Sequence, residues 1–294
     1  EVAKMYNTDH IELQDNNENI AGLLVIMQDI YDEPFADSSN IPTFLMSKLA
    51  KQYTKVVLTG DGGDELCGGY SNWYSPLYWL QTLDKLSLKK YILESCVLMI
   101  KLGLTKNRKY LYKYRGLGFK KKDLSIDIAH KTQNTYFSNK ELDSLLKNKT
   151  QNIISAEDTW VKNNSLDDAM RMDIENYMPG DILTKIDKAS MANGLELRAP
   201  FLDVDFASFC ISLPHCLKVT KETDKLILRK AFSKDWPESI RKRGKQGFGA
   251  PIKKWLSYPE MKELIKKYLK NPNNRIFEII SFENTQSFVN KNNY

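Results

Sequence analysis

The sequence has 294 residues, of which 42% are hydrophobic and 11% aromatic, so it can bury the core of one large domain or two ordinary ones. This composition excludes a disordered chain, and a net charge of +6 permits a phosphate-bearing or nucleic-acid partner without requiring either. Three histidines and no C-x-x-C pair argue against zinc. We expect the four cysteines to be reduced and mostly buried, as in a cytoplasmic protein: Cys67, Cys96, Cys210 and Cys216.

The amino-terminal part alternates short apolar segments with polar ones. Polarity alternates over His10–Gln14, which predicts a short strand. Residues 20–35 predict a helix that ends near Pro34, and residues 38–53 predict a second helix with Pro42 in its first turn. The β-branched run Lys55–Thr59 predicts a strand that is buried on both faces.

A glycine-rich turn follows this strand in the stretch VVLTGDGGDELCGGY, Val56–Tyr70, which holds five of the 14 glycines. Its three acids are Asp61, Asp64 and Glu65. Glycine lets a backbone approach a ligand closely, and carboxylates bind Mg²⁺ beside phosphate oxygens or accept a proton. A single Gly-Asp pair favours an ordinary turn, whereas this density favours a ligand site at the carboxyl end of a strand in an α/β fold.

Residues 76–164 have a helical pattern and contain no clear strand, so we expect a helical insertion here. Its most apolar stretch, Tyr91–Leu104, is interrupted by Glu94 and Lys101 and is shorter than the roughly 20 apolar residues of a membrane span. Residues 101–123 carry nine basic residues and interleaved tyrosines. A solvated helical surface is favoured over a nucleic-acid surface, because no RNA-binding motif accompanies the charge.

The last third begins with a capping signal at Ser165, and Pro179-Gly180 predicts a helix break that leaves Asp181–Met191 as a separate helix. Four acids here are interpreted as the polar face of helices: Asp173, Asp181, Asp187 and Glu196. Further on, Lys225 precedes a predicted helix, and Lys245 lies in a glycine-punctuated basic loop of the kind that suits a polyphosphate.

Four blocks in this order resemble the synthetase domain of the glutamine-hydrolysing asparagine synthetase family: Asp32–Ser47, Val56–Tyr70, Ile186–Asp203 and Lys225–Leu256. The resemblance implies a helix-rich α/β fold with a partial parallel sheet of the adenine-nucleotide α-hydrolase type. It implies that residues 1–75 belong to the nucleotide-binding α/β domain, 76–164 to the insertion, and 165–294 to a helical region that completes the site.

The resemblance also implies a reaction and its participants. Aspartate attacks the α-phosphate of ATP in the presence of Mg²⁺ to give β-aspartyl-AMP, and ammonia then displaces AMP. An amino-terminal glutaminase domain supplies that ammonia from glutamine, no membrane takes part, and the oligomeric state is left open. The implied roles are nucleotide binding by Thr59 and Gly60, catalysis by Asp61, Lys225 and Lys245, pyrophosphate and Mg²⁺ binding by Asp64 and Glu65, and substrate contacts by Asp37, Ser38 and Arg198.

The chain departs from the family pattern in three respects. Many members have Glu where this chain has Asp61, no Ser-Gly-Gly-x-Asp-Ser pyrophosphate loop occurs, and Glu1 cannot be the cysteine nucleophile of a glutaminase domain. We therefore expect the carboxyl-side portion of a longer enzyme that is inactive alone. Two alternatives are a related amidotransferase or β-lactam-synthetase-like enzyme with another carboxylate substrate, and a non-catalytic paralogue that acts as a binding partner.

Overall fold

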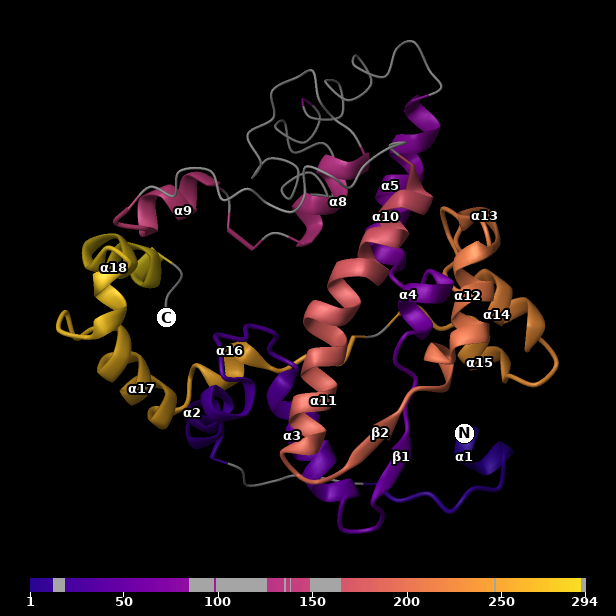
Figure 1. Ribbon diagram of the computed structural model, residues 1–294, viewed down its shortest axis with the longest axis horizontal. Coiled ribbons are helices and arrows are strands. Elements are labelled where there is room, and N and C mark those ends of the chain that lie inside the picture. Colours follow the sequence, from indigo (N-terminus) through magenta and orange to yellow (C-terminus); the bar gives the residue numbers. More distant parts are fainter. Residues whose placement is uncertain are drawn as a thin grey trace.

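The computed structural model describes residues 1–12, 19–84, 98, 126–134, 136–137, 139–148, 165–245 and 247–291. These residues form a helix-rich α/β arrangement with one two-stranded parallel sheet (Figure 1), which confirms the predicted fold class. The elements up to residue 145 are α1 (Val2–Met5), α2 (Ile20–Tyr31), α3 (Asn40–Ala50), β1 (Val56–Leu58), α4 (Gly63–Cys67), α5 (Ser71–Asp84), α8 (Ile126–Asn134) and α9 (Asn139–Leu145).

The later elements begin with a continuous helical column that crosses the middle of Figure 1 and is made of α10 (Leu166–Met172), the π-helix η2 (Asp173–Leu183) and α11 (Thr184–Met191). The chain then continues through β2 (Glu196–Arg198), η3 (Pro200–Leu202), α12 (Val204–Ser212), α13 (His215–Lys218), α14 (Leu226–Ala231), α15 (Glu238–Arg241), α16 (Ile252–Trp255), α17 (Pro259–Leu269), η4 (Arg275–Glu278) and α18 (Phe282–Lys291).

The parallel sheet joins two segments that are far apart in the sequence. β1 pairs with β2 from Val56↔Glu196 to Leu58↔Arg198, and the N–H of Thr59 donates to the carbonyl of Arg198 at 2.8 Å. The strand at Lys55–Thr59 is confirmed, but its predicted burial on both faces is wrong, since Leu58 is 74% exposed. Val56 lies on the same face of the strand as Leu58 and is also exposed, so this face is open, whereas Val57 on the other face is half-buried.

The two predicted amino-terminal helices are confirmed. α2 begins after Asn19, whose side chain accepts from the N–H of Gly22, and ends at Asp32 in the left-handed conformation. α3 carries Pro42 in its first turn, where the missing N–H costs no helical hydrogen bond. α10 begins with the capping box expected at Ser165.

Two predicted features of the secondary structure are also wrong in the described residues. Residues 10–12 of the strand predicted at His10–Gln14 form no strand, and residues 13–14 lie outside the described part. The break predicted at Pro179-Gly180 is replaced by η2, which runs through Pro179 into α11. A π-helix directs hydrogen bonds one residue further back than an α-helix, and the wider turn accommodates the proline ring and its missing N–H.

Three apolar clusters hold the helices together. The first joins α5, α8 and α10 through buried residues such as Leu77, Ile126 and Leu166. The second joins α2 to α3, and the third places α4 against α12 and α14. The first cluster ties the expected insertion to the helix that leads into η2, whereas the three predicted domain ranges themselves stay predictions.

The remaining sequence predictions concern thiols, charge and the membrane. Cys67 and Cys210 are buried free thiols, but Cys216 is exposed, and Cys96 lies outside the described residues. The basic stretch 101–123 and, apart from Leu98, the apolar stretch 91–104 also lie outside them. No helix in the described part of the chain is both long enough and apolar enough to cross a membrane.

Gly62 offers a test of the turn after β1. It has φ +83°, and a Cβ added there would lie 2.3 Å from Cδ2 of Leu202. We expect Gly62→Ala to lower the free energy of unfolding by about 1–3 kcal/mol, through strain and overlap. Gly60→Ala is the matched control, because no atom lies within 4 Å of its added Cβ. Equal urea midpoints for the two variants would contradict this account of the turn.

Candidate functional site

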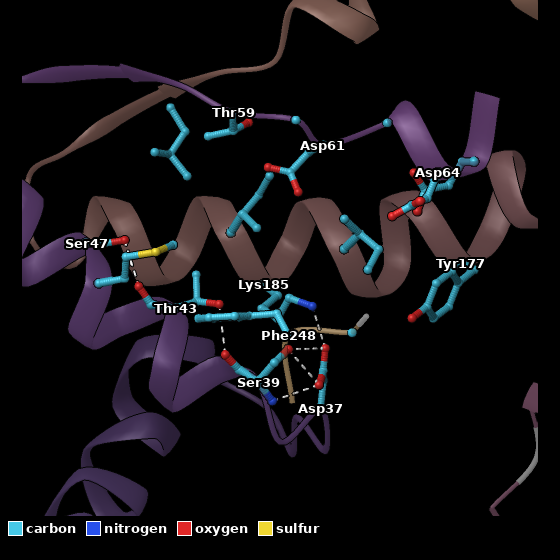
Figure 2. A pocket seen from close by; sticks show the side chains of 18 of the residues that line it. Asp37, Ser39, Thr43, Ser47, Thr59, Asp61, Asp64, Tyr177, Lys185 and Phe248 are labelled. Carbon is cyan, nitrogen blue, oxygen red and sulfur yellow. Dashed lines mark hydrogen bonds and ion pairs between the residues drawn. The ribbon is translucent and has the colours of Figure 1, made fainter. Parts of the chain in front are cut away.

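A cavity of about 750 Å³ opens at the carboxyl end of β1, between α3, α4 and the column of η2 and α11 (Figure 2). Its apolar lining comes largely from the sheet and the facing helices, including Val57, Leu197 and Ile186. Its polar lining includes Asp37, Ser39, Thr43, Ser47, Thr59, Asp61, Asp64, Glu65, Tyr70, Tyr177, Lys185 and Lys245. The cavity lies where ligands bind in open α/β sheets.

The structure brings most of the predicted site residues together. Seven of them line the cavity: Asp37, Thr59, Gly60, Asp61, Asp64, Glu65 and Lys245. Lys225 does not line it but contacts Asp64, and Ser38 is absent from the lining although Ser39 is present. Arg198 is also absent from the lining, and its exposed guanidinium donates to Glu196 at 2.8 Å instead.

Asp64 holds two lysines from separate segments. Its Oδ1 lies 2.8 Å from Nζ of Lys225, and its Oδ2 accepts from Nζ of Lys245. Burial raises the pKa of Asp64, but the two lysines outweigh burial and bring this pKa below its usual value. Gly69 makes room for the contact, because an added Cβ would lie 1.9 Å from Oδ1 of Asp64 and 2.6 Å from Cε of Lys225.

Thr59 and Asp61 present free polar groups on the same side of the cavity. Oγ1 of Thr59 is buried and has no hydrogen-bond partner among the described residues. Such a group costs free energy unless something binds it, so the hydroxyl fits a ligand hydrogen bond. The Asp61 carboxylate points into the cavity beside it in Figure 2.

A second charged group lies across the cavity, below α11 in Figure 2. Nζ of Lys185 lies 2.5 Å from Oδ2 of Asp37, and the N–H and hydroxyl of Ser39 donate to Oδ1 at 2.8 and 2.9 Å. Burial raises the pKa of Asp37, but Lys185 and Ser39 overcome it and lower this pKa. Asp181 has the opposite balance: burial and the charge of Asp37 raise its pKa to about 6.

Aromatic rings form the wall beside Asp64. Tyr70 stacks on Trp73 with centroids 4.7 Å apart, and Tyr177 meets Tyr70 edge-on at 5.9 Å. The Tyr70 hydroxyl donates to Oε1 of Glu65, a side chain that is only 2% exposed. Burial raises the pKa of Glu65, and the charges of Asp64 and Asp173 add to this increase against the Tyr70 hydrogen bond.

Behind this wall lies a buried polar group that connects three helices. The Tyr74 hydroxyl of α5 donates to Oδ2 of Asp173 at 2.5 Å, and Nε2 of His130 on α8 lies 2.8 Å from Oδ1. The interpretation of Asp173 as part of a polar helix face is therefore wrong, because this side chain is fully buried. Its two partners supply the hydrogen bonds that a buried carboxylate requires.

Sequence reasoning missed Lys185 and the role of Asp181. The available signal was a spacing of four, since Asp173, Tyr177, Asp181 and Lys185 recur at that interval. In an α-helix, residues four apart lie on nearly the same face, so the pattern resembles the polar stripe of an ordinary surface helix. The aromatic wall was missed because Tyr70, Trp73 and Tyr177 come from two separate segments.

Carboxylates and lysines gathered at the end of a parallel strand form a site suited to an anionic, phosphorylated ligand. The family model described as asparagine synthase matches residues 1–293. The glutamine-hydrolysing asparagine synthetase 1 of Bacillus subtilis (strain 168) is 33% identical over 254 residues, which are 82% of this chain and 37% of that protein. The chain belongs to the asparagine synthase family.

Other relatives carry the same description. A protein of Mycobacterium bovis, whose description names a glutamine-hydrolysing asparagine synthetase provisionally, is 33% identical over 79% of this chain and 35% of its own length. The asparagine synthetase of Gallus gallus is 42% identical over 84 residues, 26% of this chain and 15% of its own. The chain thus spans little more than a third of the bacterial relatives that it matches most extensively.

The cavity carries groups that suit a phosphorylated ligand and only part of a magnesium site. The Thr59 hydroxyl and Lys245 line it, and Lys225 contacts Asp64. The described residues contain no cluster of three or more His, Cys, Asp or Glu side chains that could hold a metal by themselves. Mg²⁺ typically binds one or two carboxylates together with substrate phosphates, and Asp64 would supply one such carboxylate.

The raised pKa of Asp181 predicts a pH-dependent stability. An unfolded Asp titrates near 4, so folding favours the protonated acid, and this contribution is lost as pH rises from about 4 to about 6. Asp181→Asn mimics the neutral acid, so its melting temperature relative to the unmodified chain should increase between pH 4.5 and 7.5. For Asp187→Asn, at an exposed position of α11, the difference in melting temperature should stay constant over this pH range. A flat or falling difference for Asp181→Asn would refute this assignment.

Proposed function

We propose that this chain provides the synthetase site of an enzyme that makes asparagine from aspartate, ATP and ammonia. The observation that carries the proposal is the pairing of Asp64 with Lys225 and Lys245 at a cavity that is also lined by the free hydroxyl of Thr59. Two cations and a hydrogen-bond donor at the end of a parallel strand suit the phosphates of a nucleotide. Membership of the asparagine synthase family supports the choice of reaction.

The proposed reaction has two steps. An oxygen of the aspartate side-chain carboxylate bonds to the α-phosphorus of ATP, and the bond from that phosphorus to the pyrophosphate oxygen breaks. Ammonia then attacks the acyl carbon, the carbon–oxygen bond to AMP breaks, and one proton leaves the nitrogen. The products are asparagine, AMP and pyrophosphate.

The residues of the cavity are assigned to these steps as follows. Thr59 and Gly60 bind the nucleotide. Lys225 and Lys245 stabilise the charge that develops on the phosphates, and this electrostatic stabilisation usually contributes most to the rate of such transfers. Asp61 accepts the proton from ammonia. Asp64 would hold Mg²⁺ together with phosphate oxygens, and a bound Mg²⁺ supplies further positive charge that neutralises the phosphates.

The charged group of Asp37, Asp181 and Lys185 is assigned to binding of the amino acid that accepts the ammonia. Asp37 and Lys185 present a carboxylate and an ammonium to the cavity, and Asp181 adds a second acid next to Asp37 although it does not line the cavity. These groups complement the α-ammonium and α-carboxylate of an amino acid. The side-chain carboxylate of such a substrate would point toward Asp61 and Asp64. Among related amidating enzymes, this complementarity favours an amino-acid acceptor over a carboxylate without an ammonium group.

The ammonia source belongs to the same proposal. The relatives that match most of this chain are described as glutamine-hydrolysing, and they are much longer than the aligned region. We propose that a glutaminase domain in the protein that carries this chain releases ammonia from glutamine.

The reaction is tested with the full-length protein that carries this chain. Aspartate, glutamine, ATP and Mg²⁺ should yield asparagine, AMP and pyrophosphate in equal amounts, because the proposed bond cleavage is at the α-phosphate. Asp64→Asn should reduce turnover by about 10²–10³-fold, since the metal contact and the anchor of both lysines are lost. Formation of ADP and phosphate would refute the reaction, and near-normal turnover of the variant would make Asp64 structural.

The 294-residue chain by itself should behave differently. Its sequence has no Ser-Gly-Gly-x-Asp-Ser run, whose backbone N–H groups and hydroxyls would cradle the phosphates. We expect the isolated chain to make no asparagine and to bind Mg-ATP with a Kd in the millimolar range or weaker, because several charge-assisted hydrogen bonds of about 1.5–3 kcal/mol each are lost. Calorimetric titration measures this, and micromolar affinity would overturn the expectation.

A further inference from the structure

We propose that Tyr70, held by the buried carboxylate of Glu65, is a positioning residue that fixes the ammonium of Lys245 over the phosphate end of the cavity. The structure joins these three side chains in series, and the inference rests on the proposed function for the task of Lys245. It assigns Glu65 to the support of a cation, rather than to the magnesium contact that its position beside Asp64 suggests.

The first link is the hydrogen bond between Tyr70 and Glu65. Glu65 lies on α4, only 2% exposed, and Oε1 accepts the Tyr70 hydroxyl. The bond closes a short loop from Glu65 to Tyr70 that includes the left-handed Gly68. A hydrogen bond to a buried carboxylate is among the stronger kinds, so it fixes the hydroxyl end of the ring.

The second link is the fixed orientation of the Tyr70 ring. Trp73 stacks on it at 4.7 Å with an interplanar angle of 25°, and the edge-on contact with Tyr177 at 5.9 Å has an angle of 77°. The stacked contact comes from the start of α5 and the edge contact from η2. Contacts from two elements, together with the hydroxyl bond, leave the ring little freedom to rotate.

The third link is the contact between the ring and Lys245. Nζ of Lys245 lies 5.5 Å from the Tyr70 ring centroid, within cation–π range, while it also pairs with Asp64. The glycines near this lysine lie in open space, since a Cβ added at Gly244, Gly247 or Gly249 would meet no atom within 4 Å, so little packs against this loop. The position of the ammonium therefore depends on its side-chain partners.

Tyr70 differs from Asp64 as a partner because the ring carries no net charge. A carboxylate competes with an incoming phosphate for the lysine, whereas an aromatic face attracts the ammonium without neutralising it. Lys225 has a different support, because it is the amino-terminal cap residue of α14 with φ +46°, and its N–H donates to the carbonyl of Gly68. Of the two lysines, only Lys245 lies over an aromatic face within the described residues.

A matched pair of substitutions separates positioning from simple support of the fold. Tyr70→Phe and Tyr74→Phe each remove one hydroxyl from a hydrogen bond to a buried carboxylate, that of Glu65 or Asp173. Of these two rings in the described structure, only that of Tyr70 lies beneath the ammonium of Lys245. A purely structural role would make the two variants alike in turnover and different only in stability.

The experiment uses the full-length protein with two readouts, steady-state kinetics and acetylation of lysines by an N-hydroxysuccinimide ester followed by mass spectrometry. The extent of acetylation at Lys245 is divided by that at the exposed Lys253, which corrects for differences in the amount of reagent. We expect Tyr70→Phe to lower kcat about 10-fold and Tyr70→Leu about 100-fold, with KM for aspartate within about twofold, because the lysine is misplaced rather than lost. Acetylation of Lys245 should rise about threefold or more in Tyr70→Leu.

The control variants are expected to keep most of their activity. Tyr74→Phe should melt at a lower temperature yet keep kcat and the acetylation ratio within about twofold. Glu65→Gln retains an oxygen that can accept the Tyr70 hydroxyl, so it should keep at least about a third of kcat. A loss in Glu65→Gln as large as that in Asp64→Asn would instead make Glu65 a metal ligand and overturn the proposal.

Equal changes in kcat for Tyr70→Phe and Tyr74→Phe would also overturn the proposal, and so would an unchanged acetylation ratio in Tyr70→Leu. If Tyr70→Leu fails to fold, Tyr70→Phe and Glu65→Gln decide between the two roles. The acetylation readout needs no turnover, so it tests the position of Lys245 even if the enzyme proves to act on another substrate. A failure of the proposed reaction is thereby distinguished from a failure of this inference.

Discussion

The attraction of one carboxylate for two lysines organises the phosphate end of the cavity. Asp64 lies on a helix of only five residues, and Lys225 and Lys245 reach it from segments more than 150 positions further along the chain. Burial raises the pKa of Asp64, and the two lysines outweigh burial and bring this pKa below its usual value, so they favour the ionised carboxylate. The glycines that flank α4 permit this approach, since Gly62 and Gly68 have positive φ and Gly69 leaves room for the ion pair.

The charges of the cavity are distributed unevenly between its two ends. Asp64 pairs with two lysines, although Asp61 and Glu65 also lie at this end, whereas Asp37 and Asp181 share one lysine. A pair of lysines supplies the cations that phosphates require, and two acids for one lysine suit an ammonium group. The raised pKa of Asp181 results from this second imbalance, since a nearby carboxylate and burial both disfavour its charged form. The pair of lysines at one end and the pair of acids at the other therefore distinguish the two ends of the cavity.

Local signals predicted the parts of this site that lie within one segment. The strand before the glycine-rich turn, the helices α2 and α3, and the capping box at Ser165 all follow from residues a few positions apart. The contact of Lys185 with Asp37 joins residues 148 positions apart, and no local rule determines such a pairing. β2 was missed for a related reason: it is three residues long, contains two charges, and is a strand only because β1 lies beside it.

The π-helix explains how one segment serves both ends of the cavity. In an α-helix, residues four apart advance by about 40° around the axis, so Asp173 and Lys185 would face directions roughly 120° apart. A π-helix has roughly 4.4 residues per turn, so residues four apart fall behind by about 30°. Ten residue steps in η2 and two in α11 therefore leave Asp173 and Lys185 roughly 60° apart instead of 120°. Asp173, Tyr177, Asp181 and Lys185 thereby lie along one side of the column. Tyr177 belongs to the aromatic wall, Asp173 binds Tyr74 behind it, and Asp181 and Lys185 meet Asp37. The wider turn around Pro179 thus keeps this row of side chains within a narrower sector than the roughly 120° of an ordinary helix.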